Sequence, residues 1–108
     1  MDAKFYTYRV FWSEEDQEFV GLCTEFPGMS WLDEDHQKAF SGIVALVQEC
    51  INDLKANNEA IPEPLSQKQY TGKFMVRIPP DQHRELAIQA AEQGVSLNRL
   101  VSSKLVVG

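Results

Sequence analysis

Two basic residues alternate with apolar ones late in the chain, in a pattern suited to contacting base edges in DNA. The run KFMVRI, residues 73–78, has the period of a strand with one polar and one apolar face. The polar face would present Lys73, Met75 and Arg77. Arginine and lysine can bond the acceptors of guanine, and methionine offers apolar contact to a thymine methyl. Ordinary solvent-facing strand charges would show the same alternation, so the neighbouring elements decide between the two interpretations.

Two short helices are predicted to follow this strand. Pro79 and Pro80 stop the strand, and Pro80 suits the first turn of a helix. Gly94 is placed to end that helix in the left-handed conformation, and Ser96 can cap the next one. The free amides at the start of the second helix would form a phosphate-binding site, and nearby lysine and arginine side chains would add positive charge. The predicted phosphate contacts are Ser96, Leu97, Asn98, Arg99 and Lys104.

The β-α-α stretch is too short to fold alone, and a second copy would solve the problem. Fewer than 40 residues bury little surface, and a lone strand leaves its backbone groups unpaired. In a homodimer the two strands pair antiparallel and four helices pack behind them. The expected shared core is Phe74, Val76, Ile78, Leu97, Leu100 and Val101. The stretch resembles the ribbon-helix-helix family, whose dimers lay a two-stranded ribbon in the DNA major groove.

The net charge of −6 is unevenly distributed along the 108 residues. Residues 70–108 hold five bases and three acids, a net +2, so residues 1–69 carry −8. Two parts of opposite sign indicate two roles. The basic part can approach phosphate, whereas the acidic part would repel it and attract a basic protein.

The acidic part is predicted to be a small α+β domain. Phe5 to Trp12 is almost continuously aromatic or β-branched, which indicates a strand buried on much of both faces. An acidic loop would connect it to a strand at 19–23, and a third strand is expected at 29–32. Asp33 or Asp35 can cap a helix that runs to about Lys55. The expected fold is a three-stranded antiparallel sheet with one long helix.

The order of these segments resembles HicB-type antitoxins. The resemblance rests on the hairpin YRVFWSEEDQEFVGLC, the FPG turn, the long helix and the IPEP linker. It implies a partial ribonuclease-H-like domain at 1–59, a linker at 60–69 and a ribbon-helix-helix domain at 70–108. It also implies that the first domain neutralises a small basic HicA-type ribonuclease toxin and that the second represses its own promoter on operator DNA. Candidate toxin contacts are Glu14, Glu15, Asp16 and Glu18.

No catalytic residue, metal site or cofactor is predicted. Nuclease chemistry of the ribonuclease-H type needs convergent carboxylates, whereas the first strand offers only Arg9 as a charge. The acids of the hairpin loop are adjacent in sequence and should fan into water. His36 and His83 are expected at the surface. A rival interpretation is a stand-alone ribbon-helix-helix transcription regulator whose N-terminal domain senses a ligand or sets the oligomeric state; whether dimers join into tetramers stays open.

The chain is expected to be cytoplasmic and independent of membranes. No apolar run approaches the roughly 20 residues that span a bilayer. The N-terminus, MDAKFYTYRVFW, lacks the charge-then-apolar order of a signal peptide. Cys23 and Cys50 show no metal-ligand spacing and are expected as buried free thiols.

Overall fold

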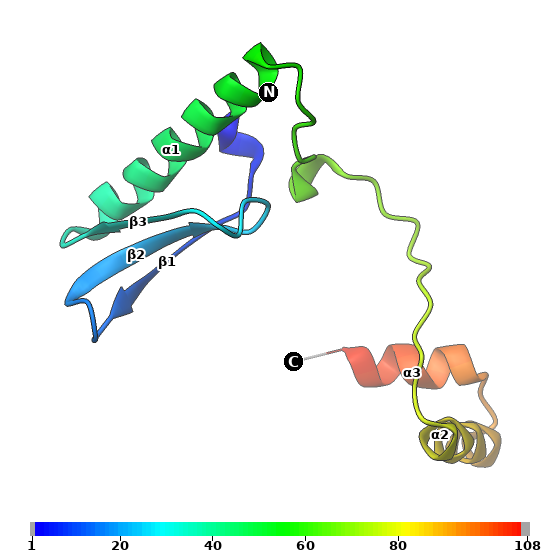
Figure 1. Cartoon of the computed structure of the whole chain (residues 1–108). Coiled ribbons are helices and arrows are strands. Elements are labelled where there is room, and N and C mark those ends of the chain that lie inside the picture. The colour runs from blue at the N-terminus through cyan, green and yellow to red at the C-terminus, as the bar shows by residue number, and fades with distance from the viewer. Residues whose placement is uncertain (1, 107–108) are drawn as a thin grey trace. The chain divides into compact units, whose positions relative to one another are not determined.

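The computed structural model describes residues 2–106 (Figure 1). The chain divides into two compact units, Met1–Tyr70 and Thr71–Gly108. They are called unit 1 and unit 2 below. Among the described residues, no helix is long and apolar enough to cross a membrane. Both cysteines are free thiols; Cys23 is buried and Cys50 is half-buried.

Unit 1 is a three-stranded antiparallel sheet with one long helix across one face, as predicted (Figure 1). The strands follow the order β1-β2-β3. Their bounds are β1 Tyr8–Ser13, β2 Glu18–Cys23 and β3 Ser30–Asp33, and the helix is α1 His36–Ala56. The first strand begins later than expected, because the short 3₁₀ helix η1, Ala3–Phe5, takes up the residues before it.

Helix α1 is specified by its caps and by its apolar spacing. The carboxylate of Asp35 accepts hydrogen bonds from the amides of Gln37 and Lys38, which selects Asp35 from the two predicted caps. The helix ends at its C-cap Asn57. Side chains at four-residue intervals face the sheet and are fully buried, as expected for one face of a helix. These are Ile43, Val47 and Ile51.

A glycine in β2 allows α1 to lie close to the sheet. A Cβ atom at Gly21 would lie 2.7 Å from the carbonyl oxygen of Ala39 and 2.9 Å from Cγ2 of Ile43. Both contacts are closer than packed atoms allow. The absence of a side chain at Gly21 therefore sets the distance between helix and sheet.

The prediction that the first strand is buried on much of both faces was wrong. Phe11 is 40% exposed and Trp12 is 45% exposed. Phe11 is exposed because α1 packs against one face of the sheet and no described element of unit 1 covers the other. Antiparallel sheets commonly leave one face open in this way. Trp12 is on the same face as Tyr8 but lies at the hairpin end of β1, where its ring packs edge-on against Phe19.

The proline-containing segment after α1 is held against unit 1. The hydroxyl of Tyr6 donates to the carbonyl of Pro62 at 2.6 Å, and the amide of Leu65 donates to the carboxylate of Glu25 at 2.9 Å. The hydroxyl of Ser66 donates to the carbonyl of Phe5. A second 3₁₀ helix, η2 Leu65–Gln67, completes the segment. Most of residues 60–69 thus packs on the domain that precedes it.

Unit 2 contains two helices, α2 Pro80–Gln93 and α3 Leu97–Leu105. Pro80 occupies the first turn of α2, and Gly94 ends that helix with φ 67°. The amide of Gly94 lies within hydrogen-bond distance of the carbonyls of Ala90 and Ala91. Ser96 caps α3 by accepting from the amide of Arg99 at 3.1 Å. These local predictions are confirmed.

Candidate nucleic-acid interface

The strand predicted at 73–78 is not formed in the single chain described here. Residues 73–78 precede α2 without regular secondary structure. A strand requires a neighbour whose backbone groups complete the ladder. Unit 2 offers no such neighbour among its described residues, so this segment differs from the expectation for lack of a partner strand.

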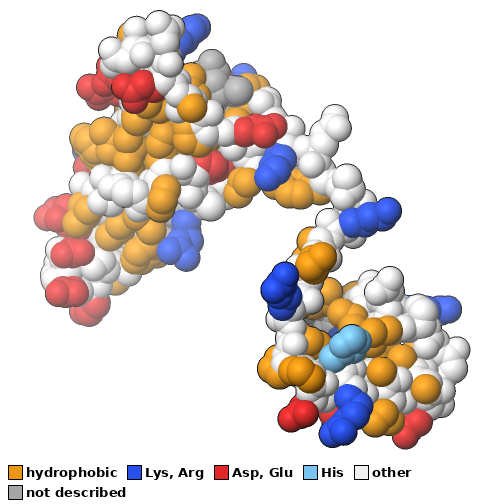
Figure 2. Space-filling model, turned by 45° about the vertical axis from the view of Figure 1, so that its right-hand side comes forward, with side chains coloured by type: hydrophobic (Ala, Val, Ile, Leu, Met, Phe, Trp, Pro, Cys, Tyr) orange, Lys and Arg blue, Asp and Glu red, His pale blue; other side chains and the backbone are white. Residues whose placement is uncertain are grey.

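Both the polar and the apolar side chains of this segment are exposed. Phe74 is 77% exposed, Val76 62% and Met75 84%, while Ile78 is half-buried. Figure 2 shows hydrophobic side chains across the visible face of unit 2, beside basic ones. Large apolar side chains uncovered side by side are typical of an interaction surface.

The apolar side chains of the segment and of the two helices line one groove in unit 2. Its volume is about 710 Å³. Its apolar lining comprises Phe74, Val76, Ile78, Leu86, Leu97, Val101 and Leu105. Five of these belong to the expected shared core; the sixth expected member, Leu100, is buried instead of lining the groove. Leu86 and Leu105 were missed as site residues, although their helical spacing could have indicated them.

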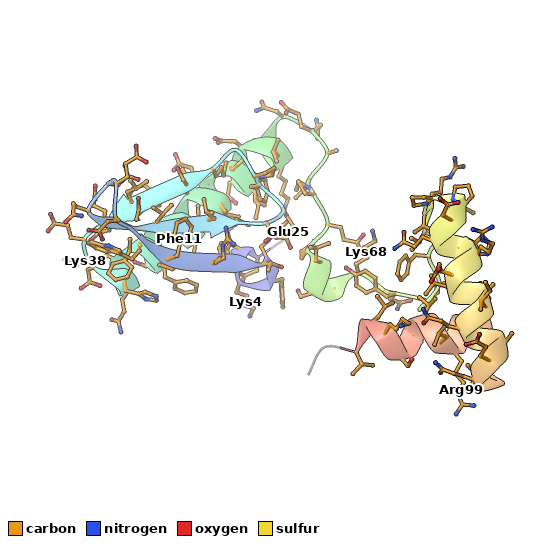
Figure 3. All side chains as sticks on the ribbon, turned by 90° about the horizontal axis from the view of Figure 1, so that it is seen from below. Lys4, Phe11, Glu25, Lys38, Lys68 and Arg99 are labelled. Atoms are coloured by element: carbon orange, nitrogen blue, oxygen red, sulfur yellow. The ribbon has the colours of Figure 1, made fainter. Side chains whose placement is uncertain are left out.

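The start of α3 brings together most of the predicted phosphate contacts. Among the described residues, the amides of Leu97 and Asn98 have no hydrogen-bond acceptor, as expected for the first turn of a helix. Arg99 lies beside them, near the junction of α2 and α3 (Figure 3). Lys104 is in the last turn of the helix, about 9 Å further along its axis than Asn98. These five residues therefore do not form one cluster.

The basic side chains of unit 2 are not paired with acids. In the part of the chain that the structure describes, the one ion pair joins Lys4 to Asp2 in unit 1. The unpaired bases of unit 2 are Lys73, Arg77, Arg84, Arg99 and Lys104. Each can reach a phosphate without first losing an ion pair, and unit 2 has a net charge of +2.

Comparison with known proteins finds a family match for the second half of the chain. Residues 56–105 match the model of the HicB family. No curated protein and no solved structure matches the chain. The matched region runs from the last residue of α1 through α3, so it includes the groove and the start of α3. The match supports a HicB-family protein and suggests one related to toxin–antitoxin systems.

Proposed function

We propose that this chain is a HicB-family antitoxin that binds a small basic HicA-type ribonuclease toxin through unit 1 and represses its own promoter through unit 2. The observation that carries the proposal is the uncovered apolar groove of unit 2, which lies beside lysine and arginine side chains that form no ion pair among the described residues. An exposed apolar surface of this kind is typical of a binding site for another protein chain. The basic side chains that alternate along residues 73–78 can bond the base edges of DNA.

A second copy of the chain is the partner proposed for the groove. Two copies of the segment 73–78 can pair antiparallel, which completes the backbone hydrogen bonds that one copy leaves unmade. Pairing would also turn Phe74, Val76 and Ile78 toward the helices, because side chains alternate along a strand. The homodimer thereby accounts for both the missing strand and the exposed side chains.

The same pairing would place the polar side chains on the outer face of the ribbon. Lys73, Met75 and Arg77 would then point together into the major groove. Arg77 can bond guanine in a bidentate manner, which makes it the strongest candidate for sequence selection. The free amides of Leu97 and Asn98 at the start of α3 would bind the phosphate backbone and fix the position of the dimer.

Unit 1 has the charge expected for binding a basic toxin. It carries thirteen acids and five bases, a net −8. In the hairpin loop, Glu14 accepts from Nε1 of Trp12 at 2.8 Å and Asp16 accepts from Ser13 at 2.9 Å. Glu15 and Glu18 have no such partner among the described residues. These two carboxylates are therefore the better candidates for toxin contacts.

The DNA half is tested by titrating the protein onto a duplex from upstream of its own gene and onto an unrelated duplex. Arg77→Ala should remove most of the preference for the upstream duplex. Arg84→Ala, which removes an equal charge from α2, should weaken binding to both duplexes equally and preserve the preference for the upstream duplex. Affinity should fall with salt in every case. Equal binding to both duplexes by the unmodified protein would contradict specific repression.

Toxin binding is tested by co-expressing the chain with a small basic protein, where a neighbouring reading frame encodes one. Co-purification and relief of growth arrest are the expected results. Specific DNA binding without either result would favour the stand-alone regulator over the antitoxin.

A further inference from the structure

One face of the sheet in unit 1 is left uncovered, and its residues follow from the strand register. Tyr8 contacts Phe40 of α1 at 5.8 Å between ring centroids, and Gly21 contacts Ile43. Side chains one residue away along each strand point to the opposite side. This opposite side, the open face, comprises Arg9, Phe11, Ser13, Glu18, Val20, Leu22, Ser30 and Leu32.

Three apolar side chains form a row across the open face. Phe11 lies opposite Val20 in the β1–β2 pair, and Val20 lies opposite Leu32 in the β2–β3 pair. The outer two members of the row are 40% and 38% exposed. Figure 3, which looks at the chain from below, shows Phe11 in front of the sheet with α1 behind it. Val20 between them is only 8% exposed, so the row presents apolar surface to solvent at its two ends, Phe11 and Leu32.

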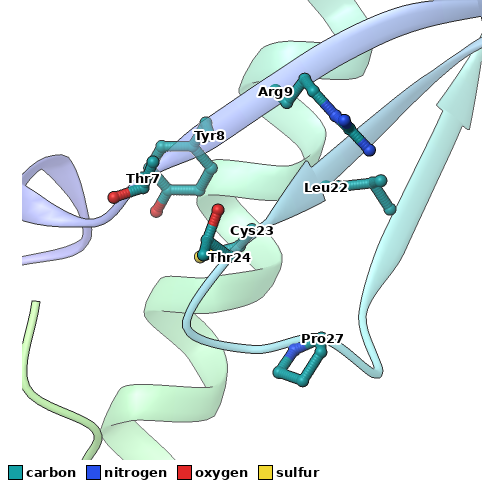
Figure 4. A pocket seen from close by; sticks show the side chains of 7 residues that line it. All are labelled: Thr7, Tyr8, Arg9, Leu22, Cys23, Thr24 and Pro27. Atoms are coloured by element: carbon teal, nitrogen blue, oxygen red, sulfur yellow. The ribbon is translucent and has the colours of Figure 1, made fainter. Parts of the chain in front are cut away.

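A hollow lies next to this row, at the end of the sheet far from the hairpin loop. Its volume is about 420 Å³. Figure 4 shows its lining, which is Thr7, Tyr8, Arg9, Leu22, Cys23, Thr24 and Pro27. The guanidinium of Arg9 lies 5.2 Å from the ring centroid of Phe11 and so connects the hollow to the row. An apolar side chain of a partner fits a hollow of this kind.

The other end of the open face is strongly acidic. The hairpin loop and the end of β3 meet there, because Phe19 at the start of β2 pairs with Asp33. Seven of the thirteen acids of unit 1 lie in the hairpin loop, at the first residue of β2, or between the end of β3 and the N-cap of α1: Glu14, Glu15, Asp16, Glu18, Asp33, Glu34 and Asp35. Lys38, in the first turn of α1, is a base at the same end. Figure 2 shows acidic side chains gathered along one side of unit 1, next to hydrophobic surface.

We propose that the open face is the surface on which unit 1 binds its small basic partner, a proposal that rests on the antitoxin function. Apolar side chains of the partner would pack on the row of Phe11, Val20 and Leu32. Its lysines or arginines would meet Glu15 and Glu18, the two hairpin carboxylates that, unlike Glu14 and Asp16, have no side-chain partner among the described residues. A second copy is a poorer occupant, because face-to-face packing would bring two units of charge −8 together.

The test measures binding of the co-purified toxin by calorimetry with full-length chains. The double variant Phe11→Ala/Leu32→Ala should weaken binding about tenfold or more, as expected for central apolar contacts. The matched control is Phe40→Ala on α1, a phenylalanine that is 47% exposed but lies outside the open face, and it should bind like the unmodified chain. Equal affinity of the double variant and the control would overturn the assignment.

The acidic end is tested by neutralising two carboxylates at a time. Glu15→Gln/Glu18→Gln should weaken binding and reduce its dependence on salt. The control Glu49→Gln/Glu59→Gln removes the same charge from α1 and the residues after it, and it should have a smaller effect. Equal effects would mean that net charge attracts the partner and that the acidic end is not its contact.

A measurement on the unmodified chain guards against variants that do not fold. Methyl NMR signals of Leu22 and Leu32 on the open face should shift when the toxin is added, while those of Val47 and Ile51, which are fully buried on α1, should not. Binding with unchanged open-face signals would overturn the surface and leave the antitoxin function standing. No binding by the unmodified chain would instead overturn the antitoxin function itself.

Discussion

The carboxylate of Glu25 accepts a hydrogen bond from the backbone amide of Leu65, 40 residues further along the chain, at 2.9 Å. The same carboxylate accepts from the amide of Thr7 at 3.0 Å and from its hydroxyl at 3.1 Å. Burial alone would raise the pKa of Glu25, but the amides of Leu65 and Thr7 outweigh burial, so the pKa is lowered. One side chain therefore ties the start of β1 and the segment after α1 to the end of β2.

Replacing Glu25 with glutamine should lower the free energy of unfolding by about 1–2 kcal/mol at neutral pH, because charge-assisted hydrogen bonds are lost. The folded pKa is lowered, so the stabilisation is present above the ordinary pKa of 4.5 and is lost as pH falls through the folded value. Urea unfolding at neutral pH and at several pH values below 4.5 measures this. The control Glu15→Gln should leave stability almost unchanged, and equal stability of both variants would contradict the role of Glu25.

The hydroxyl of Tyr8 should make unit 1 sensitive to alkaline pH. It donates to the carbonyl of Ala3 at 2.7 Å, and burial, with the nearby Cys23 and Glu25, raises the pKa of Tyr8 to about 12. The neutral form is favoured in the folded state, so stability is complete below the ordinary pKa of 10.0 and is lost as pH rises from there toward about 12. Tyr8→Phe should reduce this loss in unfolding experiments across that range. Burial also raises the pKa of Tyr6, so part of the loss of stability at alkaline pH should remain in the Tyr8→Phe variant.

The control for Tyr8 is Tyr70→Phe, at a tyrosine that is 68% exposed. It should leave the alkaline slope unchanged. A slope that Tyr8→Phe does not alter would show that the Tyr8 hydroxyl is as free to ionise in the folded state as in the unfolded one.

Gly21→Ala should destabilise unit 1 by about 1–3 kcal/mol, the usual cost of an overpacked core. The added methyl would press on the carbonyl of Ala39 and on Ile43, so α1 must move away from the sheet. Gly28→Ala is the matched control, because nothing lies within 4 Å of a Cβ atom there. Chemical denaturation of the two variants gives the comparison; an equally stable Gly21→Ala would show that the helix can shift at little cost.

Local signals explain why the helices could be predicted from the sequence. Caps act within a few residues, as Asp35 and Ser96 do, and Gly94 takes the left-handed conformation that its position suggests. Hydrophobic spacing then identified the buried face of α1 at Ile43 and Val47. None of these features depends on a distant part of the chain.

Long-range contacts explain what the sequence did not disclose. The aromatic run of β1 carries no sign that α1 covers one face only and leaves Phe11 exposed. The prolines at 62 and 64 suggest a linker, yet the bonds that hold this segment depend on Tyr6 and Glu25 far earlier in the chain. In unit 2 the strand predicted at 73–78 needs a partner strand, which the described residues of the single chain do not supply.

Val76→Asp should abolish both dimerisation and DNA binding. In one chain Val76 is 62% exposed and lines the apolar groove, so the carboxylate does not disturb the isolated unit. In the proposed dimer it would be buried without a partner, which should weaken association at least about 100-fold. Sedimentation equilibrium gives the dimer affinity, and titration of the upstream duplex gives the DNA affinity.

Met75→Asp is the matched control, because Met75 neighbours Val76 but belongs to the outward face of the proposed ribbon. Its side chain is 84% exposed, and the carboxylate would stay in water in the dimer. Dimerisation should therefore survive, while DNA binding should fall because a negative charge faces the bases and phosphates. If instead Met75→Asp dissociates the dimer and Val76→Asp does not, the two faces of the segment are assigned the wrong way round; if neither does, residues 73–78 do not form the interface.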